Sequence, residues 1–156
     1  MKRNSLNLGL AVVAAVMITA LPAAGQITVN SGNSPWVLGA GDPAVNDTSM
    51  SIGADAEARV EGSALTLSGQ MTMAQRTGAG TLATFIASGG TVDIGGALEI
   101  NRKSEGDSYV EFSGADVTVG SHLWAGLAVA GLAGGTMDFL LSDGSLTMTQ
   151  NTSEMK

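Results

Sequence analysis

The chain has 156 residues, with fourteen acidic residues against seven basic ones and no cysteine. The lack of cysteine excludes a disulfide framework and lipoprotein-type acylation. The formal net charge of −7 argues against nucleic acid as a partner, because phosphates are bound by clusters of basic side chains. With 22 glycines and only 4% aromatic residues, the composition is typical of an extended β surface and not of an enzyme cleft.

Residues 1–25 have the pattern of a secretory signal peptide. Lys2 and Arg3 precede an apolar run over residues 8–20, and small residues follow at 23–25. The run is shorter than the roughly 20 residues that a membrane-spanning helix needs. We therefore predict cleavage after Ala24 or Gly25, a secreted or cell-surface location, and no membrane span in the mature chain. Cleavage leaves five basic and fourteen acidic residues, a net charge of about −9.

Residues 26–49 contain glycines and prolines that interrupt any regular period. We predict that this segment is an N-terminal cap, with short strands at 27–29 and 36–38. A cap would cover the strand edges and the core of the first turn of a repeat protein. The next segment, Met-Ser-Ile-Gly at 50–53, resembles Val-Asp-Ile-Gly at 92–95. We predict that these two segments occupy the same column of the repeat.

A cassette of alternating apolar residues recurs at nearly even spacing. Its starts, Leu65, Val92, Val117 and Leu146, are separated by 27, 25 and 29 residues. Further apolar columns lie five residues before each start and two, six and eight residues after it. A fixed period with strand-like alternation is the signature of a solenoid. We predict an all-β fold, a parallel β-helix of about four coils over residues 50–150, with residues 151–156 as a polar tail or a truncation point.

The same alternation predicts which side chains face outward. One outward column contains three threonines and an aspartate. A second contains a threonine, a glutamate and a tryptophan. The first is Thr66, Asp93, Thr118 and Thr147, and the second is Thr72, Glu99 and Trp124.

Two segments carry a family resemblance. Residues 88–100 read Ser-Gly-Gly-Thr-Val-Asp-Ile-Gly-Gly-Ala-Leu-Glu-Ile, and residues 113–120 read Ser-Gly-Ala-Asp-Val-Thr-Val-Gly. Both resemble the β-helix repeats of secreted bacterial PEP-CTERM and autotransporter-like surface proteins. The resemblance implies a right-handed parallel β-helix, export, and a role at the cell surface or in the extracellular matrix. Such proteins usually end in a Pro-Glu-Pro motif, an apolar span and a basic tail, which the residues at 151–156 do not provide.

Residues suited to metal binding are scarce. His122 is the one histidine, and its counterparts in the repeat are Gln70 and Ala97, so a zinc site would lack imidazole and thiol ligands. We expect His122 at a solvent-exposed corner, no metal and no cofactor. The basic pair Arg102 and Lys103 is expected in a solvated turn.

Carboxylates leave an enzymatic alternative open. Glycoside hydrolysis needs two carboxyl groups about 5–9.5 Å apart. Asp93 and Asp116 lie one turn apart in the predicted stack, whereas Asp93 and Glu99 lie on different faces of one turn. A solvated face is the simpler interpretation of these acids.

Trp124 is the candidate for ligand recognition. Its indole could stack on a sugar ring while Glu99, one turn away, accepts hydrogen bonds from hydroxyl groups. The alternative is that Trp124 packs beneath the apolar loop at 126–134. We predict a non-catalytic extracellular or cell-surface module of structural or adhesin type; the alternative is a carbohydrate-active β-helix, either a lyase or hydrolase or a glycan-binding module. The expected partners are glycans or matrix components, together with end-to-end self-association through the strand at 146–148.

Overall fold

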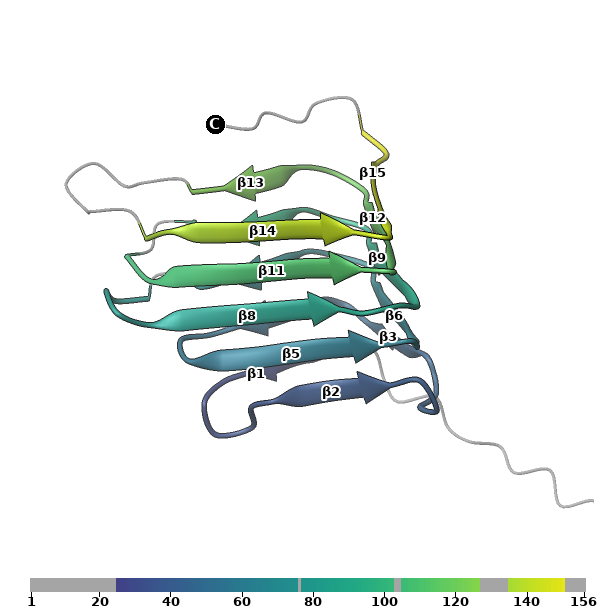
Figure 1. Cartoon of the computed structure of the whole chain (residues 1–156), viewed down its shortest axis with the longest axis horizontal. Helices are drawn as coiled ribbons and strands as arrows, with labels where there is room; N and C mark the ends of the chain where they lie inside the picture. The colour runs from purple at the N-terminus through teal and green to yellow at the C-terminus, as the bar shows by residue number, and fades with distance from the viewer. Residues whose placement is uncertain (1–24, 76, 103–104, 127–134, 151–156) are drawn as a thin grey trace, which may run out of the picture.

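The computed structural model describes residues 25–75, 77–102, 105–126 and 135–150. These residues form fifteen β-strands and no helix. Almost all of the predicted signal peptide and the whole of the predicted polar tail lie outside the described residues. The strands wind into a stack of flat turns (Figure 1).

Three strands make one turn, and each strand pairs in parallel with the strand three places later in the chain. The result is three five-stranded parallel sheets around one core. Each sheet has five stacked strands, and the chain winds through about four full turns between the first and the last of them, so the predicted all-β parallel solenoid of about four turns is confirmed.

We name the sheets A, B and C. Sheet A contains β1 (Gln26–Val29), β4 (Ser49–Ile52), β7 (Met71–Met73), β10 (Leu98–Ile100) and β13 (Leu123–Ala125). Sheet B contains β2 (Trp36–Gly39), β5 (Ala56–Glu61), β8 (Leu82–Ala87), β11 (Asp107–Ser113) and β14 (Met137–Ser142). Sheet C contains β3 (Val45–Asp47), β6 (Ala64–Leu67), β9 (Thr91–Ile94), β12 (Asp116–Val119) and β15 (Ser145–Met148).

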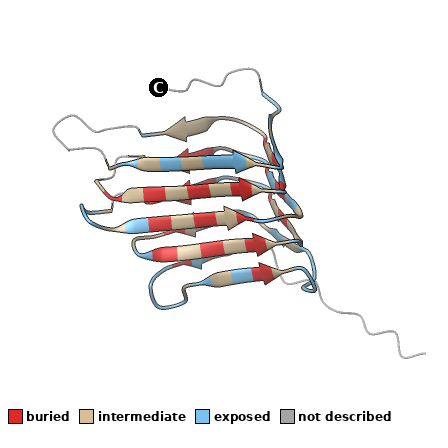
Figure 2. Cartoon of the chain, viewed as in Figure 1, coloured by how far each residue is buried: buried red, intermediate tan, exposed pale blue. Residues whose placement is uncertain are grey.

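The apolar columns of the sequence are the inward rows of these sheets. In sheet C, Leu67, Ile94 and Val119 are paired in register and at most 1% exposed. The residues beside them point outward, because successive side chains of a strand face opposite sides. In sheet B this alternation appears as bands of buried and half-buried residues along β5, β8 and β11 (Figure 2). Apolar burial on all three sheets therefore supplies the core.

Two kinds of glycine shape the corners between sheets. Before sheet C, Gly62, Gly89 and Gly114 adopt φ values of +84°, +88° and +73°, and Asp143 takes the equivalent place at +52°. This left-handed conformation is accessible to glycine and tolerated by aspartate. After sheet C the turns stack so closely that a Cβ on Gly120 would lie 2.3 Å from the carbonyl oxygen of Gly95.

The structure describes the strands near the N-terminus and changes one assignment there. Residues 26–49, predicted as a cap, contain β1, β2 and β3, which pair in register with the following strands and form the first turn. The prediction that residues 50–53 share a column with 92–95 is wrong, because Met50 and Ile52 pair with Met71 and Met73 in sheet A. Residues 92–94 belong to sheet C.

Candidate functional site

The outward column of sheet A is the most chemically varied row of the solenoid. Thr72, Glu99 and Trp124 lie side by side on β7, β10 and β13, in the predicted register. Their exposure differs from what the sequence predicts. Thr72 is 6% exposed and Glu99 is 5% exposed, whereas Trp124 is half-buried. The column points out of the sheet, but its carboxylate is shielded from solvent.

Glu99 is held by two side chains from the turns that follow the strands. Arg102 Nη1 forms an ion pair and hydrogen bond with Glu99 Oε1. Gln75 Nε2 donates to Glu99 Oε2 over 3.4 Å. Because a buried carboxylate without a partner is strongly unfavourable, these contacts explain how Glu99 is accommodated at this depth.

Trp124 contacts the same arginine. The Cζ atom of Arg102 lies 4.2 Å from the centroid of the indole ring, a cation–π arrangement. The ring of His122 meets the indole edge-on, with centroids 5.7 Å apart and planes at 68°. His122 is half-buried, and its Nδ1 lies 2.5 Å from Ser121 Oγ. We call Gln75, Glu99, Arg102, His122 and Trp124 the Trp124 cluster.

The structure thus brings together the two predicted site residues, Glu99 and Trp124, through a residue that the sequence analysis placed in a solvated turn. Arg102 is part of the cluster, and its side chain is 30% exposed. The sequence spacing could have indicated this contact, because Arg102 follows Glu99 by three residues just as Gln75 follows Thr72. The alternative that Trp124 packs beneath residues 126–134 lies mostly outside the described residues.

The outer face of sheet C carries the predicted threonine ladder. Thr66, Asp93, Thr118 and Thr147 are paired in register across β6, β9, β12 and β15. Asp93 is exposed, whereas Thr66 and Thr118 are half-buried. Side chains in such a ladder repeat at about 4.8 Å, the spacing of neighbouring strands.

The candidate carboxyl groups lie on two different sheets. Asp93 and Asp116 project from the same face of sheet C, two positions out of register, and Asp116 Oδ1 accepts a hydrogen bond from Ser145 Oγ over 2.7 Å. Glu99 lies on sheet A.

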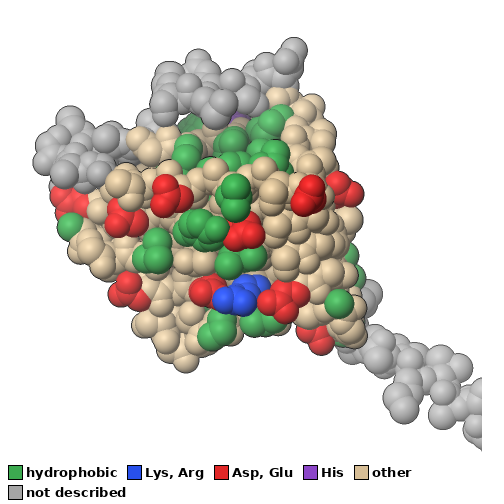
Figure 3. Space-filling view, in the orientation of Figure 1, with side chains coloured by type: hydrophobic (Ala, Val, Ile, Leu, Met, Phe, Trp, Pro, Cys, Tyr) green, Lys and Arg blue, Asp and Glu red, His purple; other side chains and the backbone are tan. Residues whose placement is uncertain are grey.

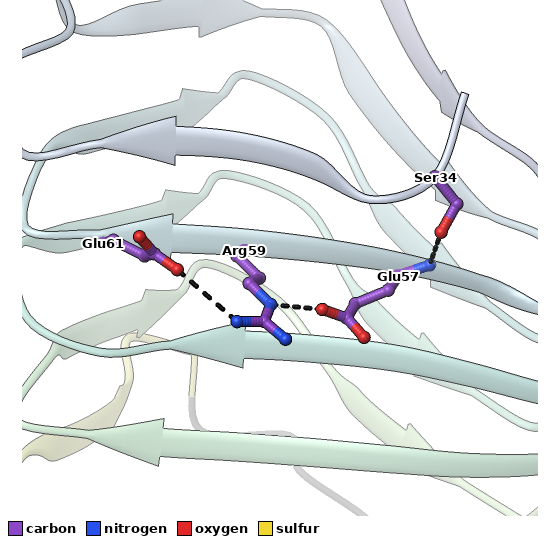
Figure 4. Close-up of polar contacts among 4 residues, drawn as sticks. All are labelled: Ser34, Glu57, Arg59 and Glu61. Carbon is purple, nitrogen blue, oxygen red and sulfur yellow. Dashed lines mark hydrogen bonds and ion pairs between the residues drawn. The ribbon is translucent and has the colours of Figure 1, made fainter.

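The outer face of sheet B is acidic. Its strands contain five acidic residues and one basic residue, Arg59. The space-filling view of this face shows basic side-chain atoms flanked by acidic ones (Figure 3). Arg59 pairs with Glu57 through Nε and approaches Glu61 Oε1 to 3.7 Å, and the backbone N–H of Glu57 donates to Ser34 Oγ (Figure 4). The hydrogen bond to Glu57 and its negative charge raise the pKa of Arg59 above its usual range. This cation is therefore already neutralised.

Tyr109 on the same face also pairs with an acidic residue on its own strand. The hydroxyl of Tyr109 donates to Glu111 Oε2 over 2.7 Å, and this hydrogen bond raises the pKa of the phenol. These three pairs, Glu57–Arg59, Arg59–Glu61 and Tyr109–Glu111, link residues that are two apart on one strand, so they stabilise the surface of single strands.

A polar network, buried at Asn101 and Ser108 and exposed at Thr136, joins sheets A and B at their shared corner. Asn101 is 2% exposed with φ +54°; its Nδ2 donates to the carbonyl of Thr136 over 2.7 Å, and its Oδ1 accepts from Ser108 Oγ. Asp107 Oδ1 accepts from the N–H and the hydroxyl of Thr136, at 2.7 and 2.8 Å. These two hydrogen bonds lower the pKa of Asp107. The network links successive turns of the solenoid, and this structural role accounts for its residues.

In the described part of the chain, no three histidine, cysteine or acidic residues are grouped as metal ligands. No helix there is long and apolar enough to cross a membrane. Comparisons with protein-family models, with curated proteins and with solved structures found no match to this chain. The assignment of a function therefore depends on the geometry described above.

Proposed function

We propose that this chain is a non-catalytic structural module of the cell surface or extracellular matrix, of the adhesin type. The observation that supports the proposal is the continuity of the three sheets, whose register is unbroken from β1 to β15. A solenoid of this kind presents long regular faces while each turn contacts only its neighbours. Export, and kinship with PEP-CTERM or autotransporter-like proteins, rest on the sequence patterns at residues 1–25, 88–100 and 113–120.

A specific observation favours glycan binding as a second function. In the Trp124 cluster the guanidinium of Arg102 contacts both the indole ring of Trp124 and the carboxylate of Glu99. The cation–π contact and the ion pair hold these three groups in place. Sugar sites combine an aromatic face with a few polar groups that orient the hydroxyls. Since Arg102 covers one face of the indole, a sugar would stack on Trp124 after displacing the guanidinium, or would bind its exposed edge.

Assays on purified residues 26–156 test both functions. We expect no turnover of pectin, alginate or other uronic-acid polymers, measured as unsaturated products and as new reducing ends. A rate that disappears in Asp93→Asn, Glu99→Gln or Asp116→Asn would overturn the non-catalytic proposal in favour of the carbohydrate-active alternative.

Tryptophan fluorescence tests the binding function, because the chain has two tryptophans, Trp36 and Trp124. In the Trp36→Phe variant all tryptophan emission comes from Trp124, and we expect weak, saturable quenching by oligosaccharides of the same polymers. The matched Trp124→Phe variant should bind none of them. Equal binding by both variants would exclude the Trp124 cluster as the glycan site and leave the structural function untouched.

A further inference from the structure

The outer face of sheet B carries apolar side chains that meet solvent. Among the described residues, the most exposed large apolar side chains all lie on strands of this sheet: Val37 on β2, Leu82 on β8, and Leu140 and Leu141 on β14. Val37, Leu82 and Leu140 alternate with inward residues, so they point out of the sheet at 45%, 47% and 46% exposure. The outward ladder of sheet C, by contrast, consists of threonines and an aspartate.

One outward row of sheet B alternates apolar and charged side chains. It contains Val37, Arg59, Ile86, Glu111 and Leu140, which pair in register from β2 to β14. We call it the Val37 row. Its apolar members recur on every second strand, so at about 4.8 Å per strand they lie about 9.6 Å apart, and the whole row is about 19 Å long.

Acidic side chains flank the Val37 row on both sides. Glu57 and Asp138 lie two residues before members of the row on their strands, and Glu61 lies two residues after Arg59. With five acidic residues and one basic residue, the strands of sheet B carry a net charge of −4. Arg59 is already engaged by Glu57 and Glu61. Hydrophobic and acidic side chains therefore share this face (Figure 3).

The charge of this face selects against several kinds of partner. Nucleic acid, an anionic membrane surface and the same face of a second copy all carry negative charge, so sheet B repels them. A small cation neutralises the acids but leaves the apolar side chains in water. The complementary surface combines lysine or arginine with apolar side chains, and a polypeptide supplies both.

The spacing of the Val37 row matches one side of an α-helix. Residues i and i+7 of a helix lie on the same side, about 10.5 Å apart along the axis. This rise is close to the roughly 9.6 Å between the apolar members of the row. A helix of about 15 residues laid across the strands therefore spans the row. Basic side chains on either side of its apolar stripe then lie over the flanking acids.

We propose that the outer face of sheet B docks a basic amphipathic helix of another protein, with the helix axis along the Val37 row. Apolar side chains of the helix bury Val37, Ile86 and Leu140, and its lysines or arginines pair with Glu61 and Asp138. This face lies on a different sheet from the Trp124 cluster. The inference goes beyond the proposed function and holds whether or not the chain binds a glycan.

The size of the face sets the expected affinity. The row is about 19 Å long and a strand of sheet B such as β5, with six residues, is about 20 Å long, which gives an area of about 400 Å². Stable protein interfaces bury about 800 Å² on each partner. We therefore expect a weak complex, with a Kd of about 10–100 μM.

Calorimetric titration of the full chain with synthetic peptides tests the proposal. The probe is a helix of about 21 residues with leucine at the a and d positions of each heptad and lysine at e and g, where like charges oppose pairing of the peptide with itself. We expect saturable binding that weakens as salt is added, because salt screens the ion pairs. No binding at millimolar peptide, or affinity independent of salt, would overturn the proposal.

Two control peptides separate the contributions of charge and helical spacing. One carries glutamate in place of every lysine, and the other keeps the composition of the probe but distributes its leucines over all sides of the helix. Each should bind at least about tenfold more weakly than the probe. Equal binding of the first would contradict the charge complementarity. Equal binding of the second would show attraction to the acids alone, and the helix docking would be wrong.

Two exposed aspartates supply matched variants. Asp138 lies on β14 of sheet B and Asp93 on β9 of sheet C, so their replacement by asparagine removes one negative charge from different faces. Asp138→Asn should weaken binding of the probe at least about threefold, and Asp93→Asn less than about 1.5-fold. Equal effects would show that the peptide responds to the net charge of the chain, and this result would overturn the proposed site.

A double variant tests the apolar part of the contact. Val37 and Leu140 are exposed, so Val37→Ser with Leu140→Ser should leave the β signal in circular dichroism unchanged. The same variant should bind the probe at least about tenfold more weakly. Full affinity in a folded double variant would show that the Val37 row is not the docking surface. If the double variant unfolds, Asp138→Asn and Asp93→Asn still decide which face binds.

Discussion

The guanidinium of Arg102 lies over the indole of Trp124, with Cζ 4.2 Å from the ring centroid, and the same guanidinium pairs with Glu99. Glu99 is 5% exposed, so this guanidinium contacts a carboxylate that has little access to solvent. One arginine therefore positions the aromatic ring and neutralises the carboxylate of the candidate site.

Replacing Arg102 by alanine should destabilise the fold. The Arg102→Ala variant leaves the shielded Glu99 without its cation, at an expected cost of about 1–3 kcal/mol in urea unfolding. Adding Glu99→Gln should recover part of the loss, because the unpaired charge is then absent. Arg59→Ala is the control, since Arg59 and its partners are more exposed, and it should lower the midpoint less. An additive double variant would show that Arg102 and Glu99 are not coupled.

Substitutions at two adjacent positions should separate the faces of sheet C. Ile94 is 1% exposed, and Asp93 beside it is exposed. Ile94→Asp places an unpaired charge in the core, at a cost of about 3–5 kcal/mol. Asp93→Ser should change the free energy of unfolding by less than about 0.5 kcal/mol. Equal shifts in melting temperature would contradict the assignment of the inward face.

The register of the solenoid could be predicted from sequence because parallel in-register stacking repeats the same side chains. Val60, Ala87, Phe112 and Leu141 form one column in the sequence and one inward row of sheet B in the structure. Left-handed corners likewise repeat, as glycine or aspartate three residues before each cassette.

Alternation does not say to which sheet a strand belongs, and this explains the wrong placement of residues 50–53. Met-Ser-Ile in sheet A and Val-Asp-Ile in sheet C have the same pattern of apolar and polar residues. The distance along the chain carried the missing information, because Leu65 follows Met50 by 15 residues, too few for a full turn.

The alternation of apolar and polar residues could not predict the burial of Glu99, for a different reason. Alternation gives the direction of a side chain but not what covers it. Arg102 and Gln75 return over sheet A from the turns after β10 and β7, and only their three-residue offset from the strand hints at this contact.

Two glycines should respond differently to alanine. Gly114 has φ +73°, and an added Cβ would have its nearest neighbour at 3.8 Å, so Gly114→Ala costs the left-handed strain alone, about 1–2 kcal/mol. Gly120→Ala puts a Cβ 2.3 Å from the backbone oxygen of Gly95 and forces two turns apart, so its loss should be larger. Gly114→Asn should be milder than Gly114→Ala, because asparagine tolerates this conformation. Denaturant unfolding of the three variants measures the order, and a smaller loss for Gly120→Ala would contradict the close packing of the turns.

The corner carboxylate should make part of the stability depend on pH. Hydrogen bonds from the N–H and hydroxyl of Thr136 lower the pKa of Asp107 below its ordinary value of 3.8. A group whose pKa is lower in the folded state stabilises that state above the unfolded pKa and loses its contribution as pH falls through the folded pKa. Asp107→Asn should therefore melt below the unaltered chain at neutral pH, and the difference should shrink as pH falls below about 3.8.

Thr136→Val is the matched variant for this pH dependence. It removes the hydroxyl donor but keeps the backbone N–H of residue 136, so its melting temperature at neutral pH should lie between those of the unaltered chain and Asp107→Asn. Thermal melts followed by circular dichroism from acidic to neutral pH measure all three proteins. If the gap between the unaltered chain and Asp107→Asn stayed constant over this range, the carboxylate charge would not contribute to holding the turns together.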